Sequence, residues 1–106
     1  MKQYKVYRSK LLNEKLQNMP KDFVEWLSKV ENQLVINPYV GKPLGFEWFR
    51  EKKYGKYGLY YLIYEDLIAT YLVTTSEKKD QQKIINTIKL FLEEYREEIE
   101  SISKGK

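Results

Sequence analysis

Hydrophobic positions follow two different periods in the first third of the chain. Residues 4–8 carry aromatic and β-branched side chains in a partly alternating pattern, which predicts a short strand. Two segments with apolar residues at helical spacing follow, and Ser9 and Pro20 suit the starts of two helices. Asn37 and Pro38 end the second helix. The two helices should form an antiparallel hairpin that buries two apolar stripes: Leu12, Leu16 and Met19, and Phe23, Trp26, Leu27, Val30 and Leu34.

The remainder of the chain predicts three strands and a last helix. Residues 39–45 are expected to form a loop, and the strands then cover 47–54, 59–64 and 67–75. Glu65 and Asp66 leave room only for a tight hairpin turn. Residues 78–99 carry one apolar face and predict a single long helix, with Ser76 and Asp80 as alternative N-caps.

The predicted order of elements is β-α-α-β-β-β-α. We therefore expect one α+β domain over residues 1–106, a length that suits a single domain. The strands should form a small antiparallel sheet, with the first strand alongside. The N-terminal helical hairpin should cover one face, the C-terminal helix should complete the domain, and the other face should stay partly open.

Two absent residue types narrow the chemistry. The chain has no cysteine and no histidine, which excludes disulfides, thiolate catalysis, imidazole bases and zinc sites built on either residue. No acidic pair is spaced to suggest a metal site, so we expect no metal and no cofactor. No apolar run approaches the ~20 residues of a membrane span, and the charged N-terminus does not resemble a signal peptide. We expect a cytoplasmic protein.

Positive charge is concentrated in the first part of the chain. Residues 1–64 carry twelve basic and six acidic side chains, whereas residues 65–106 carry seven and nine. A basic body with an acidic tail fits a nucleic-acid partner, although ordinary solubility explains it equally. In the strand at 47–54, alternation places Trp48, Arg50, Lys52 and Tyr54 on one face. Such a face could hold phosphates and stack on bases, or could simply be a solvated strand.

The strongest motif lies in the second half of the chain. It runs from Tyr60 to Tyr64 as Tyr-Tyr-Leu-Ile-Tyr, continues through Glu65 and Asp66 into a strand rich in Leu and Val, and ends in a basic segment at 76–80. This pattern, in a chain of this order and length, resembles the RelE/ParE toxins. Many members carry an arginine at the second position of the strand motif, where this sequence has Tyr61.

The resemblance implies a toxin of a type II toxin–antitoxin system. RelE-like members cleave mRNA, usually on the ribosome, through Arg, Lys and Tyr on a concave sheet face. ParE-like members poison DNA gyrase instead, and an antitoxin wraps around either kind. The expected partners are therefore a cognate antitoxin, mRNA and the ribosome, with no membrane and no small-molecule ligand. A gyrase-binding toxin and a decayed member that only binds a partner remain alternatives.

The resemblance and the residues together suggest a metal-free transesterification, in which the 2′-hydroxyl attacks the adjacent phosphate. Arg50 would stabilise the developing charge, because its planar fork matches a phosphate. Lys52 would be the base, since a neighbouring cation favours its neutral form. Tyr61 would orient the phosphate, donate a proton or stack on a base. We expect RNA binding without chemistry from Lys53, Lys56, Tyr57, Lys78 and Lys79.

Overall fold

The N-terminal strand and the two helices form, although the first helix ends at Leu16 and leaves Met19, which was predicted to lie on its apolar face, in the following turn. The computed structural model describes residues 2–104, in which β1 (Lys5–Arg8) is followed by α1 (Lys10–Leu16) and α2 (Lys21–Ile36). The Ser9 hydroxyl caps α1 by accepting a hydrogen bond from the Leu12 amide at 2.9 Å. Asn37 and Pro38 end α2 as predicted. No helix among the described residues is long and apolar enough to cross a membrane.

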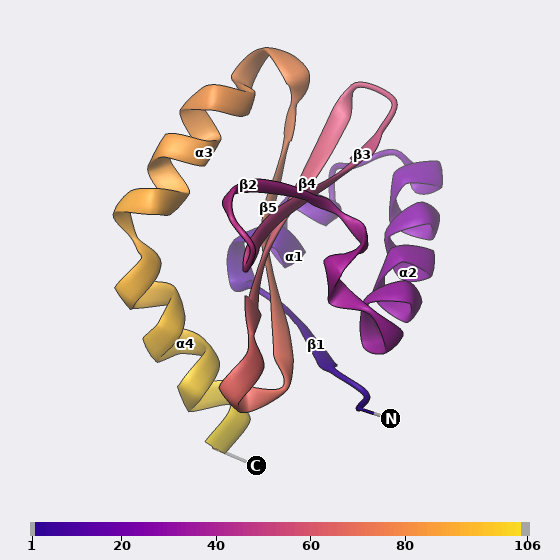
Figure 1. The fold of residues 1–106 in the computed structure, drawn as a ribbon. Helices are drawn as coiled ribbons and strands as arrows, with labels where there is room; N and C mark the ends of the chain where they lie inside the picture. Colours follow the sequence, from indigo (N-terminus) through magenta and orange to yellow (C-terminus); the bar gives the residue numbers. More distant parts are fainter. Residues whose placement is uncertain (1, 105–106) are drawn as a thin grey trace.

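A five-stranded mixed sheet lies at the centre of the molecule (Figure 1). Its strand order is β1-β5-β4-β3-β2, with β2 (Lys42–Phe46), β3 (Phe49–Tyr54), β4 (Tyr57–Tyr64) and β5 (Ala69–Glu77). The last four strands pair antiparallel, whereas β1 pairs parallel with β5. Strands β3 to β5 make the predicted three-stranded meander and β2 extends it, while β1 joins its edge through the long connection that a parallel pair requires.

Three local predictions were wrong. The expected loop at 39–45 contains β2, which was missed because Pro43 and Gly45 are untypical of strands. The turn after β4 is a 3₁₀ turn at Glu65–Leu67 followed by Ile68 in the left-handed conformation (φ 48°), so β5 begins two residues later than expected. The last helix is divided into α3 (Gln81–Leu90) and α4 (Leu92–Lys104), because the backbone leaves helical geometry at Phe91.

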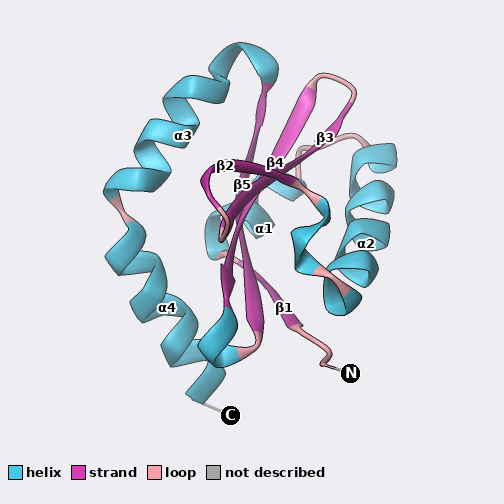
Figure 2. Cartoon of the chain, in the orientation of Figure 1, coloured by secondary structure: helices cyan, strands magenta, loops and turns pink. Residues whose placement is uncertain are grey.

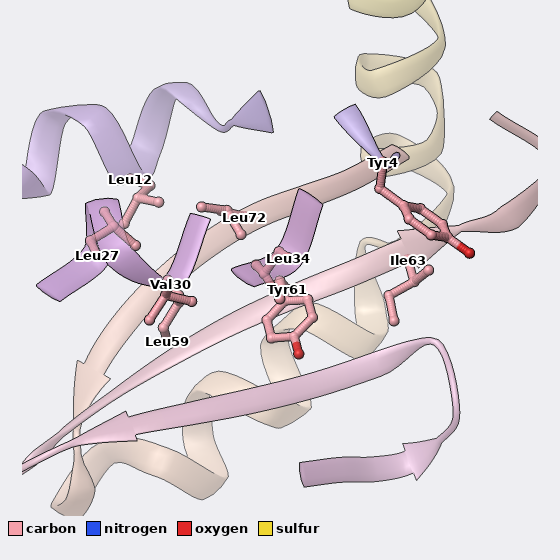
Figure 3. Close-up of a cluster of buried hydrophobic side chains, with 9 residues drawn as sticks. All are labelled: Tyr4, Leu12, Leu27, Val30, Leu34, Leu59, Tyr61, Ile63 and Leu72. Carbon is pink, nitrogen blue, oxygen red and sulfur yellow. The ribbon is translucent and has the colours of Figure 1, made fainter. Parts of the chain in front are cut away.

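Helices cover both faces of the sheet, which contradicts the expectation of an open face (Figure 2). The α1–α2 hairpin packs on one face, where odd-numbered residues of β4 point (Figure 3). Helices α3 and α4 pack on the other, against even-numbered residues of β4 and odd-numbered residues of β5. The break at Phe91 lets α4 change direction and remain against the sheet. The core on the α1–α2 side includes Leu12, Leu27, Val30, Leu34, Leu59, Tyr61, Ile63 and Leu72. The core on the α3–α4 side includes Phe49, Tyr60, Leu62, Tyr71, Val73, Ile85, Ile88 and Ile99.

Candidate functional site

Arg50 lies on the face that α2 covers and is bonded to the backbone. The residue is only 7% exposed. The guanidinium donates to the carbonyl oxygens of Gly41 (3.0 Å) and Tyr39 (3.0 Å). It also donates to the carbonyl oxygen of Glu47 (2.9 Å) and contacts the Glu47 carboxylate. Most of its hydrogen-bonding capacity is therefore used to hold the chain on either side of β2.

Tyr61 pairs with Arg50 in the sheet and is fully buried. Its hydroxyl donates to the Pro38 carbonyl oxygen at 2.8 Å and accepts from the Gly41 amide at 3.0 Å. Burial raises the pKa of Tyr61, although the Gly41 amide and the nearby Arg50 oppose the shift. The hydroxyl therefore stays protonated with both hydrogen bonds used. This environment indicates a structural role for Arg50 and Tyr61, while Lys52 on the same strand is partly exposed.

Four of the five residues predicted to bind RNA come together at one end of the sheet. Lys53, Lys56, Tyr57 and Lys78 line a cleft of about 110 Å³ on the α3 side, together with Glu51, Gly55, Gly58 and Gln81. We call this the basic cleft. Lys79, the fifth residue, follows Lys78 in the 3₁₀ turn before α3 and is exposed. The basic cleft carries three lysines and one glutamate, so its formal charge is positive.

The β3–β4 hairpin and the end of β5 build the basic cleft. Gly55 and Lys56 form a two-residue turn, and the positive φ of Gly55 (58°) is what the first central position of a type II′ turn requires. The Lys78 amide donates to the Lys56 carbonyl oxygen at 2.8 Å, which ties the hairpin tip to the segment before α3. Lys53 lies opposite Gly58 in the sheet. Segments 25 residues apart in sequence thus place their lysines side by side.

Glu51 is the site residue that the sequence interpretation overlooked. It is 3% exposed, and the Gln81 side-chain amide lies 2.9 and 3.0 Å from its two carboxylate oxygens. Gly58 makes room for it, because a Cβ atom at Gly58 would lie 2.5 Å from Glu51 Oε2. The sequence did contain a signal: alternation places Glu51 on the opposite strand face from Arg50. A carboxylate at an inward position of a strand requires a reason.

Tyr60 adds a second polar group behind the basic cleft. Its hydroxyl lies 2.9 Å from Ser76 Oγ. Burial raises the pKa of Tyr60 and the neighbouring Glu51 carboxylate adds to the shift, whereas Ser76 opposes it. Tyr60 therefore stays a neutral hydroxyl. Within residues 2–104, no group of three or more acidic side chains is placed to hold a metal ion.

The solved structures to which this chain is similar share its architecture. No protein-family model matches the sequence, and neither does any curated protein. Solved structures do match. A mutant of the E. coli toxin RelE in the free state superposes with a TM-score of 0.70, at 13% identity, covering 82% of this chain and 96% of that one.

Two toxin–antitoxin complexes give a similar result. The RelBE2 complex from Mycobacterium tuberculosis matches with a TM-score of 0.62 and 22% identity over 73% of this chain and 93% of that one. The archaeal RelE–RelB complex from Pyrococcus horikoshii matches with a TM-score of 0.53 and 18% identity over 72% and 96%. The resemblance inferred from the sequence is confirmed at the level of architecture: this chain has the fold of the RelE toxins.

Proposed function

We propose that the chain is the toxin of a type II toxin–antitoxin pair and that it cleaves mRNA at the basic cleft. The observation that carries the proposal is the convergence of Lys53, Lys56 and Lys78 around the buried carboxylate of Glu51. The RelE-like fold supports it, because the similar structures include toxins in complex with antitoxins. The cognate antitoxin is accordingly the proposed protein partner.

The size and charge of the basic cleft suit one phosphate group. Its volume of about 110 Å³ is well below the ~300 Å³ at which pockets for whole small molecules begin. Three ammonium groups can approach a phosphate from different elements: Lys53 from β3, Lys56 from the hairpin tip and Lys78 from the turn before α3. The exposed Lys79 and the partly exposed Lys52 would add contacts to neighbouring phosphates, which strengthen binding without sequence preference.

The proposed reaction is a metal-free transesterification. Glu51 accepts the proton of the ribose 2′-hydroxyl as the 2′-oxygen attacks the adjacent phosphorus. The lysines stabilise the negative charge that develops on the phosphate oxygens. The bond from phosphorus to the 5′-oxygen breaks, and a lysine ammonium donates a proton to that oxygen. The products are a 2′,3′-cyclic phosphate and a free 5′-hydroxyl.

Ribosome dependence follows from how little of the substrate the cleft itself can hold. A single flexible mRNA would have to be bent so that its 2′-oxygen, phosphorus and 5′-oxygen lie in line, and holding reactants in such a geometry is a large part of the barrier. A ribosome that holds the mRNA in a fixed conformation would supply that alignment.

A second candidate function rests on exposed aromatic residues. Phe46 and Trp48 stack with ring centroids 4.5 Å apart, although they are 44% and 37% exposed. Exposed aromatic pairs are typical of protein-binding surfaces. This surface would serve a non-enzymatic toxin of the gyrase-binding kind.

The test is induced expression in a host cell with primer extension on a translated reporter mRNA. Glu51→Gln and the double variant Lys53→Ala/Lys78→Ala should each reduce discrete in-frame cuts by about 100-fold or more. Lys10→Ala/Lys29→Ala removes the same charge from α1 and α2 and should cut normally. Unfolding curves for all variants show whether a loss of cutting reflects a loss of structure.

Other outcomes separate the alternatives. Growth arrest without cuts would overturn the nuclease and favour a toxin with a protein target. If Phe46→Ser/Trp48→Ser then abolished the arrest, the aromatic pair would be its binding surface. A protein with no effect on growth would be a decayed member. If the cuts persist in the cleft variants but vanish in Lys52→Ala, the catalytic site lies on the α2 face of β3 instead.

A further inference from the structure

A second, larger cleft adjoins the basic cleft. Its volume is about 480 Å³, and it lies between the turn after α1, the end of β5 and the first turns of α3. We call it the side cleft. Tyr57 lines both clefts. The lining that concerns recognition comprises Asn18, Met19, Tyr57, Ser76, Asp80 and Ile84.

We propose that the side cleft binds the nucleobase adjacent to the phosphate held in the basic cleft and so sets the sequence preference of the cut. This inference rests on the proposed function, because it assigns the other half of the same nucleotide. The side cleft exceeds the ~300 Å³ at which pockets for small molecules begin, whereas the basic cleft does not.

The charges of the two clefts point to different ligands. In the side cleft, Lys15 and Lys83 are matched by Glu77 and Asp80, so the formal charge is zero. The Lys15 ammonium is also held by the Thr75 carbonyl oxygen at 2.8 Å. A phosphate would gain little there and would meet two carboxylates. An uncharged, polar-edged group such as a nucleobase avoids that repulsion.

The side chains of the side cleft supply both kinds of contact that a base needs. The Asn18 amide offers donors and an acceptor, and the Asp80 carboxylate accepts, whereas the Ser76 hydroxyl is already hydrogen-bonded to the Tyr60 hydroxyl and the Glu77 carbonyl oxygen. Met19 and Ile84 add apolar surface for the faces of a base, and the Tyr57 ring provides an aromatic wall. Single-stranded RNA is recognised by this combination of stacking and edge hydrogen bonds.

The residues at the boundary of the two clefts are held in place by strand pairing. Tyr57 pairs with Glu77 in the sheet, and Gly58 pairs with Ser76. The Phe23 ring packs against Tyr57 with centroids 5.3 Å apart at an interplanar angle of 66°. The Phe23 ring therefore restricts the orientation of the Tyr57 ring. Because Tyr57 lies between the clefts, one nucleotide could place its phosphate in the basic cleft and its base in the side cleft.

Binding can be tested without cleavage. The ¹⁵N-labelled protein would be titrated with 2′-O-methyl dinucleotides that differ in one base, which lack the attacking hydroxyl. We expect the Asn18 side-chain amide and the backbone amides of Met19 and Ser76 to shift, with Kd values that depend on the base. Asn18→Ala should reduce the ratio of Kd values between the best and worst bases by about 3- to 10-fold, the loss expected for one hydrogen bond.

Asn13→Ala is the matched control, because Asn13 is an exposed residue of α1 outside the side cleft. It should keep the full discrimination between bases. The proposal is overturned if no dinucleotide shifts the side-cleft signals, if the shifts are the same for every base, or if Asn18→Ala discriminates as well as the wild type.

Cut sites in cells provide the second readout. Asn18→Ala should move the preferred cut sites while the total amount of cutting stays within about 3-fold of the wild type. A wild-type protein that discriminates bases but never cleaves would refute the proposed nuclease and leave base binding established. Unchanged cut sites in Asn18→Ala would refute the side cleft as the specificity site while the nuclease stands.

Discussion

The α2 face of β3 and the basic cleft use the same residue types in opposite ways. On the α2 face, the Arg50 guanidinium and the Tyr61 hydroxyl are buried and bonded to backbone groups of residues 38–47. In the basic cleft, Lys53, Lys56 and Lys78 are exposed at the end of the sheet. The role of a cationic side chain therefore depends on which groups accept its hydrogen bonds. Arg50 holds the chain around β2, whereas the lysines are available to a ligand.

Replacement of Arg50 should give the largest effect on stability. Arg50→Leu leaves the buried carbonyl oxygen of Gly41 and the partly buried carbonyl oxygens of Glu47 and Tyr39 without their donor, and a buried unsatisfied group costs about 1–3 kcal/mol. We expect the free energy of unfolding to fall by about 3 kcal/mol or more in urea denaturation. Lys53→Leu is the control and should stay within about 0.5 kcal/mol of the wild type. Equal stability of the two variants would refute the structural role of Arg50.

Tyr61→Phe should have the next largest effect. The change removes one hydroxyl and leaves the Gly41 amide and the Pro38 carbonyl oxygen unpaired in a buried site. The expected loss is about 1–3 kcal/mol in the same denaturation experiment. Tyr57→Phe, made at the partly exposed tyrosine between the two clefts, should leave stability nearly unchanged. A stable Tyr61→Phe protein that no longer cuts RNA would instead make this hydroxyl part of the chemistry.

Alkaline pH should lower the free energy of unfolding, because the tyrosines inside the fold ionise. Burial raises the pKa of Tyr64 to about 12, with Arg96 opposing the shift, and burial also raises the pKa of Tyr61 and Tyr71. Because the folded pKa lies above the unfolded value of ~10, this stability is complete below pH ~10 and is lost as the pH rises through the folded pKa. Urea unfolding at a series of pH values should show the decline between about pH 10 and pH 12. Tyr64→Phe should make the decline shallower, and an unchanged pH profile would argue against the assignment.

Gly58→Ala should separate activity from stability. The new Cβ atom would lie 2.5 Å from Glu51 Oε2, so the carboxylate must leave its position beside Gln81. We expect cutting in the reporter assay to fall about tenfold or more, with a stability change of about 1 kcal/mol or less. Gly45→Ala is the opposite control: it strains a residue with φ +92° near only the Lys89 ammonium and should lower stability but not cutting. Normal cutting by Gly58→Ala would show that Glu51 is not the base.

The sequence predicted the fold class and most of the elements, chiefly through periodicity and residue type. Alternation and helical spacing are local properties, so they predicted β1, the α1–α2 hairpin, the three strands of the meander and the Ser9 cap. The basic residues of the site could also be selected by type, and Lys53, Lys56, Tyr57 and Lys78 do line one cleft. Whether they act on RNA remains a prediction.

Tertiary structure decided which face each side chain meets. The sequence could show that Arg50 and Glu51 point to opposite faces, but not that α2 and the segment before β2 would bury the first. It could not show that α3 and α4 cover the face expected to be open, because one apolar stripe fits either face. The proximity of Lys78 to Lys53 depends on strand pairing and the Lys56–Lys78 backbone hydrogen bond. Such contacts join residues far apart in the chain, so local sequence patterns cannot predict them.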